Sequence, residues 1–199
     1  MGEKKKGLRA RDLITTGIFT ALFIIVTFVF AMVLSGMPIL TLFITSAGGL
    51  VSGTFFLYLA VKVGKFGAVT LMSFLVSLFM FLAGHFWPCL IFGAIFGLGA
   101  DFLCGLGGYK KFWWNVAGYV VMILGLSLDG YTPMLFFADA FVASRAQMGM
   151  SPEYVERILD ITRGPLLIGA FGVAAICAVM GACIGRLLLR KHFEKAGIL

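Results

Sequence analysis

Charged residues are scarce in this chain: Asp, Glu, Lys and Arg together make up 13% of its 199 residues, about half the share found in an average soluble domain. Hydrophobic residues make up 61%, which is more apolar surface than a soluble fold of this size can bury. The shortage of charge therefore argues against a soluble globular protein and indicates that lipid is the solvent for most of the chain.

Motifs for catalysis and metal binding are also missing. The sequence has no Gly-x-x-x-x-Gly-Lys-Ser/Thr loop for ATP hydrolysis and no His-Glu-x-x-His zinc motif. Its four cysteines form no Cys-x-x-Cys pair, and it has only two histidines, His85 and His192. Convergent catalytic groups are too few for a membrane enzyme, so we expect no enzymatic activity and no cofactor or metal that the chain itself requires.

Long apolar runs fill most of the remaining sequence. A helix needs about 20 apolar residues to cross a hydrocarbon core about 30 Å thick, and these runs lack the period-two alternation of barrel strands. The predicted spans cover residues 13–34, 39–61, 67–83, 89–106, 113–128 and 164–189. We therefore expect an all-α, polytopic bundle of six transmembrane helices, forming a single domain over residues 1–199.

The basic residues predict how this bundle is oriented, because Lys and Arg are enriched in cytoplasmic segments. With the N-terminus inside, 13 of the 16 basic residues fall on the inner side: Lys4, Lys5, Lys6, Arg9, Arg11, Lys62, Lys65, Lys110, Lys111, Arg186, Arg190, Lys191 and Lys195. The outer segments hold only Arg145, Arg157 and Arg163. This alternation predicts a multi-pass protein of the cell membrane with both termini in the cytoplasm, and it explains the net charge of +7 without a nucleic-acid partner.

The outer segment 129–163 differs from the rest of the chain because it holds five of the nine acids. Ser151-Pro152-Glu153 is a typical helix start, with a capping residue, a proline at the first position and an acid in the first turn. We expect two short helices lying over the outer face, the second covering about residues 154–162. Loops of this length are usually functional.

Polar and aromatic side chains gather at the predicted outer ends of the spans. Such groups at the mouth of a helix bundle can form a small-molecule pocket. The candidate substrate-binding residues are His85, Trp87, Asp129, Tyr131, Asp139 and Arg145. For Trp87 and Tyr131 an interfacial aromatic belt is the alternative. For His85 a metal contact stays open as a weaker alternative.

Asp101 is the clearest ionisable residue at membrane depth. It precedes Lys110 by nine residues, which places it about 13 Å inside the inner boundary at 1.5 Å per residue. An intramembrane acid is a functional-site hypothesis by default. The alternative is that Asp101 reaches the inner surface or pairs with Lys110 or Lys111.

Small residues at helix-packing spacing occur in three places: Gly93-x-x-x-Gly97, Gly181-x-x-x-Gly185 and Gly17-x-x-x-Ala21. Small side chains allow helix backbones to approach closely in lipid. Ordinary packing within the chain explains the first two. For Gly17 and Ala21 a contact with another protein is the alternative to internal packing.

Three stretches of the sequence carry a resemblance to a known family. They are Leu8-Arg9-Ala10-Arg11-Asp12-Leu13-Ile14-Thr15-Thr16-Gly17-Ile18-Phe19-Thr20-Ala21, then Ala100-Asp101 with Gly107-Gly108-Tyr109-Lys110, and the tail Arg190-Lys191-His192-Phe193-Glu194-Lys195-Ala196-Gly197-Ile198. With the layout of the whole chain, they resemble the substrate-binding S components of energy-coupling factor (ECF) transporters, most closely the Trep_Strep group of integral membrane proteins.

This resemblance implies a division of labour between subunits. An S component binds a vitamin-like or cofactor-like molecule from outside, while a transmembrane coupling (T) protein and two ABC ATPases supply the energy for uptake. The first helix of the family typically carries an Ala-x-x-x-Ala patch that packs on the coupling protein. Gly17-x-x-x-Ala21 stands in the matching place, so the resemblance implies that Gly17 and Ala21 contact the coupling subunit.

The substrate does not follow from the resemblance, since no signature of the riboflavin, thiamine, biotin or folate type is present. Haem or another metal complex is one candidate, suggested by His85 and by Met148 and Met150. The alternative functions are a solitary secondary transporter or channel, and a membrane scaffold that binds no ligand. Secondary transporters often have inverted repeats and charged sites at the membrane midplane, and neither is clear in this sequence.

Overall fold

The computed structural model describes residues 7–195, with side chains to residue 190. The described residues form nine helices: α1 (Ala10–Leu34), α2 (Pro38–Thr41), α3 (Ile44–Val63), α4 (Ala68–Leu82), α5 (Pro88–Leu106), α6 (Phe112–Phe136), α7 (Ala138–Gln147), α8 (Pro152–Arg163) and α9 (Leu166–Lys195). Lys4, Lys5 and Lys6 lie outside the described residues, as do residues 196–198 of the tail stretch that carries the family resemblance.

Five of the helices in residues 7–195 are long and apolar enough to cross a membrane, namely α1, α3, α5, α6 and α9. The helix α4 is also apolar but has only 15 residues. At 1.5 Å per residue it rises about 22 Å, less than the hydrocarbon core of about 30 Å. The chain is thus a polytopic helical membrane protein in which one apolar helix is markedly shorter than the others.

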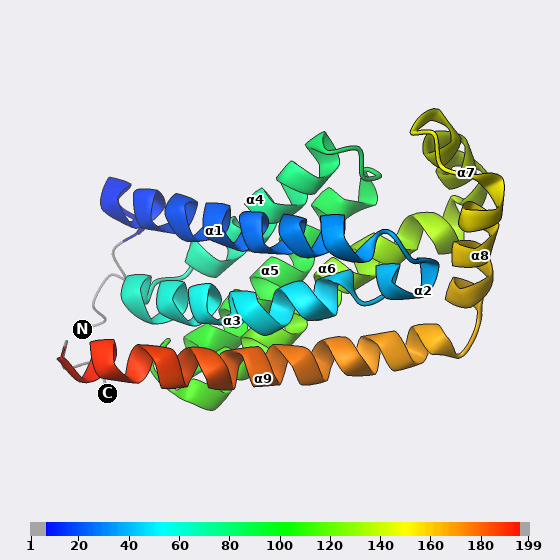
Figure 1. Cartoon of the computed structure of the whole chain (residues 1–199). Helices are drawn as coiled ribbons and strands as arrows, with labels where there is room; N and C mark the ends of the chain where they lie inside the picture. The colour runs from blue at the N-terminus through cyan, green and yellow to red at the C-terminus, as the bar shows by residue number, and fades with distance from the viewer. Residues whose placement is uncertain (1–6, 196–199) are drawn as a thin grey trace.

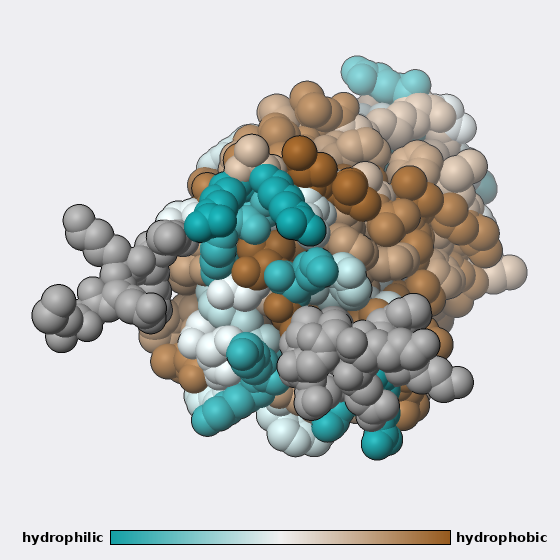
Figure 2. All heavy atoms as spheres, turned by 90° about the vertical axis from the view of Figure 1, so that its left-hand side faces the viewer, coloured by the Kyte–Doolittle hydropathy of each residue, from teal (hydrophilic) through white to brown (hydrophobic). Residues whose placement is uncertain are grey.

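The long helices run side by side, and α1 begins at the same end of the bundle at which α9 ends (Figure 1). The short helices α7 and α8 lie across the opposite end. Figure 2 faces the end where α1 begins: hydrophilic residues gather there, while the flank of the bundle is hydrophobic. The described basic residues at this end lie at helix termini, in turns and in the last third of α9: Arg9, Arg11, Lys62, Lys65, Lys110, Lys111, Arg186 and Arg190.

Close approach of α3 and α9 forms one side of the bundle, and it requires glycine. A Cβ on Gly53 would lie 2.4 Å from the Gly181 carbonyl carbon, and one on Gly185 would lie 2.8 Å from the Thr54 Cα. Gly93 and Gly97 are equally confined by Ser77 and Ser73 of α4. Both Gly-x-x-x-Gly clusters therefore pack within the chain, as the sequence favoured.

Two predicted spans differ from the observed helices. The predicted span 39–61 is broken, because α2 ends at Thr41 and α3 starts only at Ile44. The predicted span 113–128 ended just before Asp129, whereas the observed helix α6 continues to Phe136 and includes Pro133. Its last two turns remain helical because Asp129 is buried inside the bundle rather than exposed in a loop.

Within the segment 129–163, the residues after α6 fold into two short helices of the predicted kind, α7 and α8. The Ser151 hydroxyl accepts a hydrogen bond of 3.3 Å from the Tyr154 amide, and Pro152 occupies the first turn of α8. Val155, Ile158 and Leu159 of α8 are buried against Met134 of α6 and Phe141 of α7. This small apolar cluster holds α7 and α8 on the bundle.

The turn between α4 and α5 stops short of the end at which α7 and α8 lie (Figure 1). It does so because α4 has 15 residues whereas α1 and α6 each have 25. His85 of this turn and Arg145 of α7 both line the cavity that forms the candidate site.

Candidate functional site

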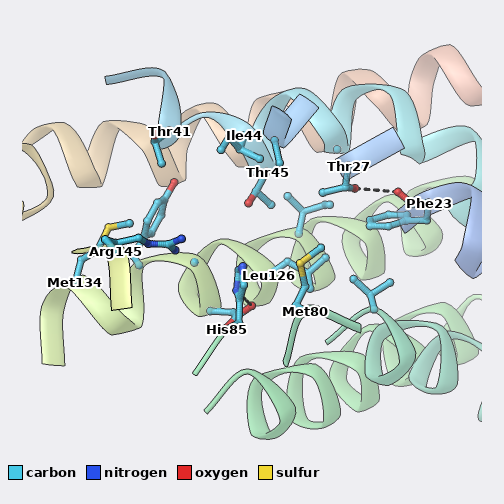
Figure 3. A pocket seen from close by; sticks show the side chains of 17 residues that line it. Phe23, Thr27, Thr41, Ile44, Thr45, Met80, His85, Leu126, Met134 and Arg145 are labelled. Atoms are coloured by element: carbon cyan, nitrogen blue, oxygen red, sulfur yellow. Dashed lines mark hydrogen bonds and ion pairs between the residues drawn. The ribbon is translucent and has the colours of Figure 1, made fainter. Parts of the chain in front are cut away.

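A cavity of about 150 Å³ lies inside the bundle at the end opposite the start of α1 (Figure 3). It lies between α1, α3, α4 and α6, with residues of α2, α7 and the α4–α5 turn at the end nearer α7. Its lining residues are Phe23, Thr27, Ala31, Thr41, Ile44, Thr45, Gly49, Val76, Met80, His85, Ile123, Leu126, Asp129, Gly130, Tyr131, Met134 and Arg145.

His85 and Asp129 form a pair at one wall of the cavity. The His85 Nδ1 lies 3.4 Å from the Asp129 Oδ2, and the Asp129 side chain is only 5% exposed, against 32% for His85. A carboxylate this close to an imidazole favours one orientation of the ring. The pair also joins the α4–α5 turn to α6.

Arg145 enters the same cavity from α7. In Figure 3 it lies with Met134 at one end of the pocket, while Phe23 and Thr27 lie at the other. Its guanidinium stacks on the Phe141 ring at 5.0 Å, and Nη1 donates to the Met148 sulfur at 3.4 Å. Burial lowers the pKa of Arg145 from its ordinary value, but an arginine stays protonated at neutral pH.

Two tyrosines connect the helices around the α7–α8 end of the bundle. The Tyr131 hydroxyl donates to the Leu42 carbonyl at 2.5 Å, and its ring meets Phe171 edge-on. The Tyr154 hydroxyl of α8 contacts the Ser35 carbonyl and lies 3.2 Å from the Thr41 hydroxyl. These bonds tie α6 and α8 to the segment that links α1 with α3.

A glycine and a proline shape the wall that α6 contributes. Gly130 borders the cavity, and an added Cβ there would meet no heavy atom within 4 Å. Pro133 lacks an N–H, so the carbonyl of Asp129, four residues earlier, cannot receive the usual helical hydrogen bond from it. The wall beside Asp129 is thus open and carries a carbonyl with spare acceptor capacity.

Four of the six predicted pocket residues, His85, Asp129, Tyr131 and Arg145, line this one cavity. The other two lie outside its lining. Trp87 precedes α5 and is 56% exposed, and Asp139 is exposed in the first turn of α7. The exposure of Trp87 agrees with the alternative that it belongs to an interfacial belt.

Other lining residues were not predicted, above all Thr27, Thr41 and Thr45. A threonine inside an apolar run is a weak signal, because its hydroxyl can bond to the carbonyl of the preceding helical turn. The Thr27 hydroxyl does so, donating to the Phe23 carbonyl at 2.9 Å.

Asp101 lies at the other end of the bundle, fully buried. Its Oδ2 accepts hydrogen bonds from the Gly67 amide, the Thr70 amide and the Thr70 hydroxyl at 2.8–2.9 Å. Its Oδ1 accepts from the Tyr109 hydroxyl at 2.7 Å. Asp101 therefore caps the start of α4, a position where the helix dipole favours negative charge, and it faces Tyr109 rather than Lys110 or Lys111.

Gly17 and Ala21 are exposed on α1. An added Cβ on Gly17 would meet no heavy atom within 4 Å, and their neighbours Ile14 and Ile18 are 65% and 54% exposed. This face of α1 therefore packs on nothing within the described part of the chain.

The fold and the cavity together define an integral membrane protein of apolar helices with a small pocket at one end. Among the described residues, no group of three or more His, Cys, Asp or Glu side chains could hold a metal ion. The chain belongs to the Trep_Strep family, described as hypothetical bacterial integral membrane proteins, whose family model matches residues 10–195. No curated protein and no solved structure matches the chain.

Proposed function

We propose that this protein is the substrate-binding S subunit of an ECF-type ABC importer, which captures a small vitamin-like or cofactor-like molecule outside the cell. The observation that carries the proposal is the cavity formed by His85, Asp129, Tyr131 and Arg145 at the end opposite the start of α1. A cavity with apolar walls and a few converging polar groups is the usual form of a small-molecule site.

The proposed topology has six transmembrane helices, with α4 as the sixth, and both termini in the cytoplasm. The basic residues at the end shown in Figure 2 support it, because positive charge marks the cytoplasmic side. In this orientation α7 and α8 lie outside the cell and the cavity faces outward, as capture of an external substrate requires.

Energy for uptake then has to come from partners, since the sequence has no Walker motif. The proposed partners are a transmembrane coupling protein and two ABC ATPases. The exposed face of α1 around Gly17 and Ala21 supports this assignment, because small residues without an internal packing partner allow a second helix to approach closely.

The cavity volume favours a compact substrate. At about 150 Å³, the space matches a cavity that holds a single benzene-sized ring. Haem has four pyrrole rings around its iron and needs several times that space. We therefore favour a molecule of one ring over haem as the substrate.

The test of the proposed function is purification of the chain from its own membranes under mild detergent, followed by mass spectrometry of proteins and small molecules. Recovery of a membrane coupling protein, two ATPases and a bound compound is the expected result. Transport by the purified chain alone in liposomes would instead favour a solitary transporter, and recovery without ligand or ATPase would favour a scaffold.

The role of the cavity has a separate test in Gly130→Leu. This substitution places a branched side chain beside the cavity where there is free space, so the bundle should fold while the co-purified compound is lost. Gly169→Leu is the matched control, because an added Cβ on Gly169 of α9 also meets nothing within 4 Å and Gly169 does not line the cavity. Equal recovery of the compound from both variants would place the substrate elsewhere.

A further inference from the structure

Arg145 brings a positive charge into the cavity that no carboxylate neutralises. Across residues 7–190, the ion pairs in the structure join Lys65 to Asp12 and His85 to Asp129, and the contacts of Arg145 are the Phe141 ring and the Met148 sulfur. A ring face and a thioether engage a guanidinium without cancelling its charge. Its planar fork of N–H donors fits a carboxylate or a phosphate through two parallel hydrogen bonds.

The acidic group in the cavity, by contrast, already has a partner. The Asp129 carboxylate is nearly buried and lies against the His85 ring. A ligand cation would have to compete with His85 for this carboxylate, whereas a ligand anion meets no competitor at Arg145. Arg145 is therefore the charged lining residue that forms no ion pair with another residue of the range 7–190, and it lies at the end formed by α7.

The remainder of the cavity favours one apolar ring. Phe23, Val76, Ile123 and Leu126 contribute apolar side chains to its lining, and the volume is about 150 Å³. An apolar cavity of that volume accepts a benzene-sized guest. An anionic group at Arg145 would leave such a ring among these side chains.

We propose that the substrate is a one-ring monocarboxylic acid whose carboxylate binds the Arg145 guanidinium, whose ring fills the apolar part of the cavity, and whose ring substituent or ring heteroatom meets the His85–Asp129 pair. This inference rests on the proposed function, because it names the substrate class of the same pocket. A phosphate monoester fits less well. It carries close to two negative charges at neutral pH, whereas Arg145 is the one Lys or Arg among the described residues that line the cavity.

The experiment measures binding of benzoate, benzamide and phenyl phosphate to the purified full-length chain in lipid nanodiscs by isothermal titration calorimetry. Benzoate and benzamide have nearly the same shape and differ in charge. Benzoate should bind about 10- to 100-fold more tightly than benzamide, the range expected for hydrogen bonds to a charged group, and more tightly than phenyl phosphate.

Variants then assign this preference to one side chain. Arg145→Gln should abolish the preference for benzoate over benzamide. Arg145→Lys should retain part of this preference, since lysine keeps the positive charge but lacks the planar set of guanidinium N–H donors. Arg157→Gln is the matched control, because Arg157 is exposed on α8 and does not line the cavity; its preference should equal that of the unmodified chain. If Arg145→Gln fails to fold, the benzoate-to-benzamide ratio of the unmodified chain decides the question by itself.

Equal binding of benzoate and benzamide, binding of neither, tighter binding of phenyl phosphate, or an unchanged preference in Arg145→Gln would overturn the substrate class. Co-purification of ATPases separates this failure from failure of the proposed function. A chain that co-purifies with ATPases but ignores benzoate remains an importer subunit with another substrate. A chain that binds benzoate through Arg145 without ATPases keeps the substrate class and loses the importer role.

Discussion

Asp101 is a buried carboxylate whose surroundings assign it a structural role. It accepts four hydrogen bonds, from Gly67, twice from Thr70, and from Tyr109, and so joins α5 to the start of α4 and to the α5–α6 turn. Tyr109 itself has a positive φ of 60°, and the Asn115 amide donates to its carbonyl at 2.9 Å. This network holds a backbone conformation that L-residues rarely adopt.

We expect Asp101→Ala to destabilise the bundle by at least about 2 kcal/mol, because hydrogen bonds to charged groups contribute roughly 1.5–3 kcal/mol each and their buried donors would lose their acceptor. The measurement is the melting temperature in detergent. Asp139→Ala, which removes an exposed carboxylate from α7, is the control and should melt like the unmodified chain. An unchanged melting temperature for Asp101→Ala would contradict the capping role.

The polar residues of the site could be predicted from the sequence because ionisable groups are rare in this chain and those at the outer ends of spans stand out. Asp129 and Arg145 lie 16 positions apart on different helices, yet both were predicted on one side of the membrane. Which of these residues face inward could not be predicted. That depends on the rotation of each helix and on the short α4, which leave Trp87 and Asp139 outside the cavity lining and bring Thr45 into it.

At the scale of single helices, α1 differs from the others because it is the least buried of the candidate spans in residues 7–195. Thr16, Thr20 and Phe23 face the bundle, while Gly17 and Ala21 face away from it. Packing within the chain thus covers one face of α1 and leaves the face with Gly17 and Ala21 uncovered. Internal packing was one of the two explanations for this small-residue motif, and the described residues do not provide it.

We expect Gly17→Leu or Ala21→Leu to reduce recovery of the coupling protein and ATPases several-fold while leaving ligand binding intact. The added side chains would keep a neighbouring helix from close approach, and neither residue lines the cavity. Quantitative mass spectrometry of pull-downs is the measurement. Gly172→Leu on the open side of α9 is the control, and partner recovery at unmodified levels in both α1 variants would show that the contact lies elsewhere.

Helix boundaries were predictable where charge or glycine ends an apolar run, as at Gly64, which adopts the left-handed conformation after α3. They were not predictable where tertiary contacts override the local signal. Asp129 and Pro133 both suggest the end of a helix by sequence rules. However, the His85 contact accommodates Asp129, and α6 continues for seven further residues to Phe136.

For the whole molecule, charge is distributed unevenly between the two ends. The end at which α1 begins carries most of the described basic residues, and the α7–α8 end carries the acids Asp139, Glu153, Glu156 and Asp160. This asymmetry predicts a single orientation in the membrane.

We expect a membrane-impermeant maleimide to label Asp139→Cys in intact cells and to label Lys110→Cys only after permeabilisation. Both positions are exposed, and they lie near opposite ends of the bundle. The unmodified chain is the control, because it measures the background labelling of the four native cysteines, of which Cys89 and Cys104 are buried. Labelling of Lys110→Cys but not Asp139→Cys in intact cells would reverse the orientation and place the cavity toward the cytoplasm.

The short α4 has a consequence for the lipid around it. If α4 crosses the membrane, its rise of about 22 Å falls about 8 Å short of an average hydrocarbon core, and the neighbouring α1 and α5 do not share this mismatch because they have 25 and 19 residues. The bilayer then has to thin along one flank of the protein only. Acyl-chain length should therefore act on the turn that carries His85, and a thicker membrane would strain the outer mouth of the cavity before it affected the rest of the bundle.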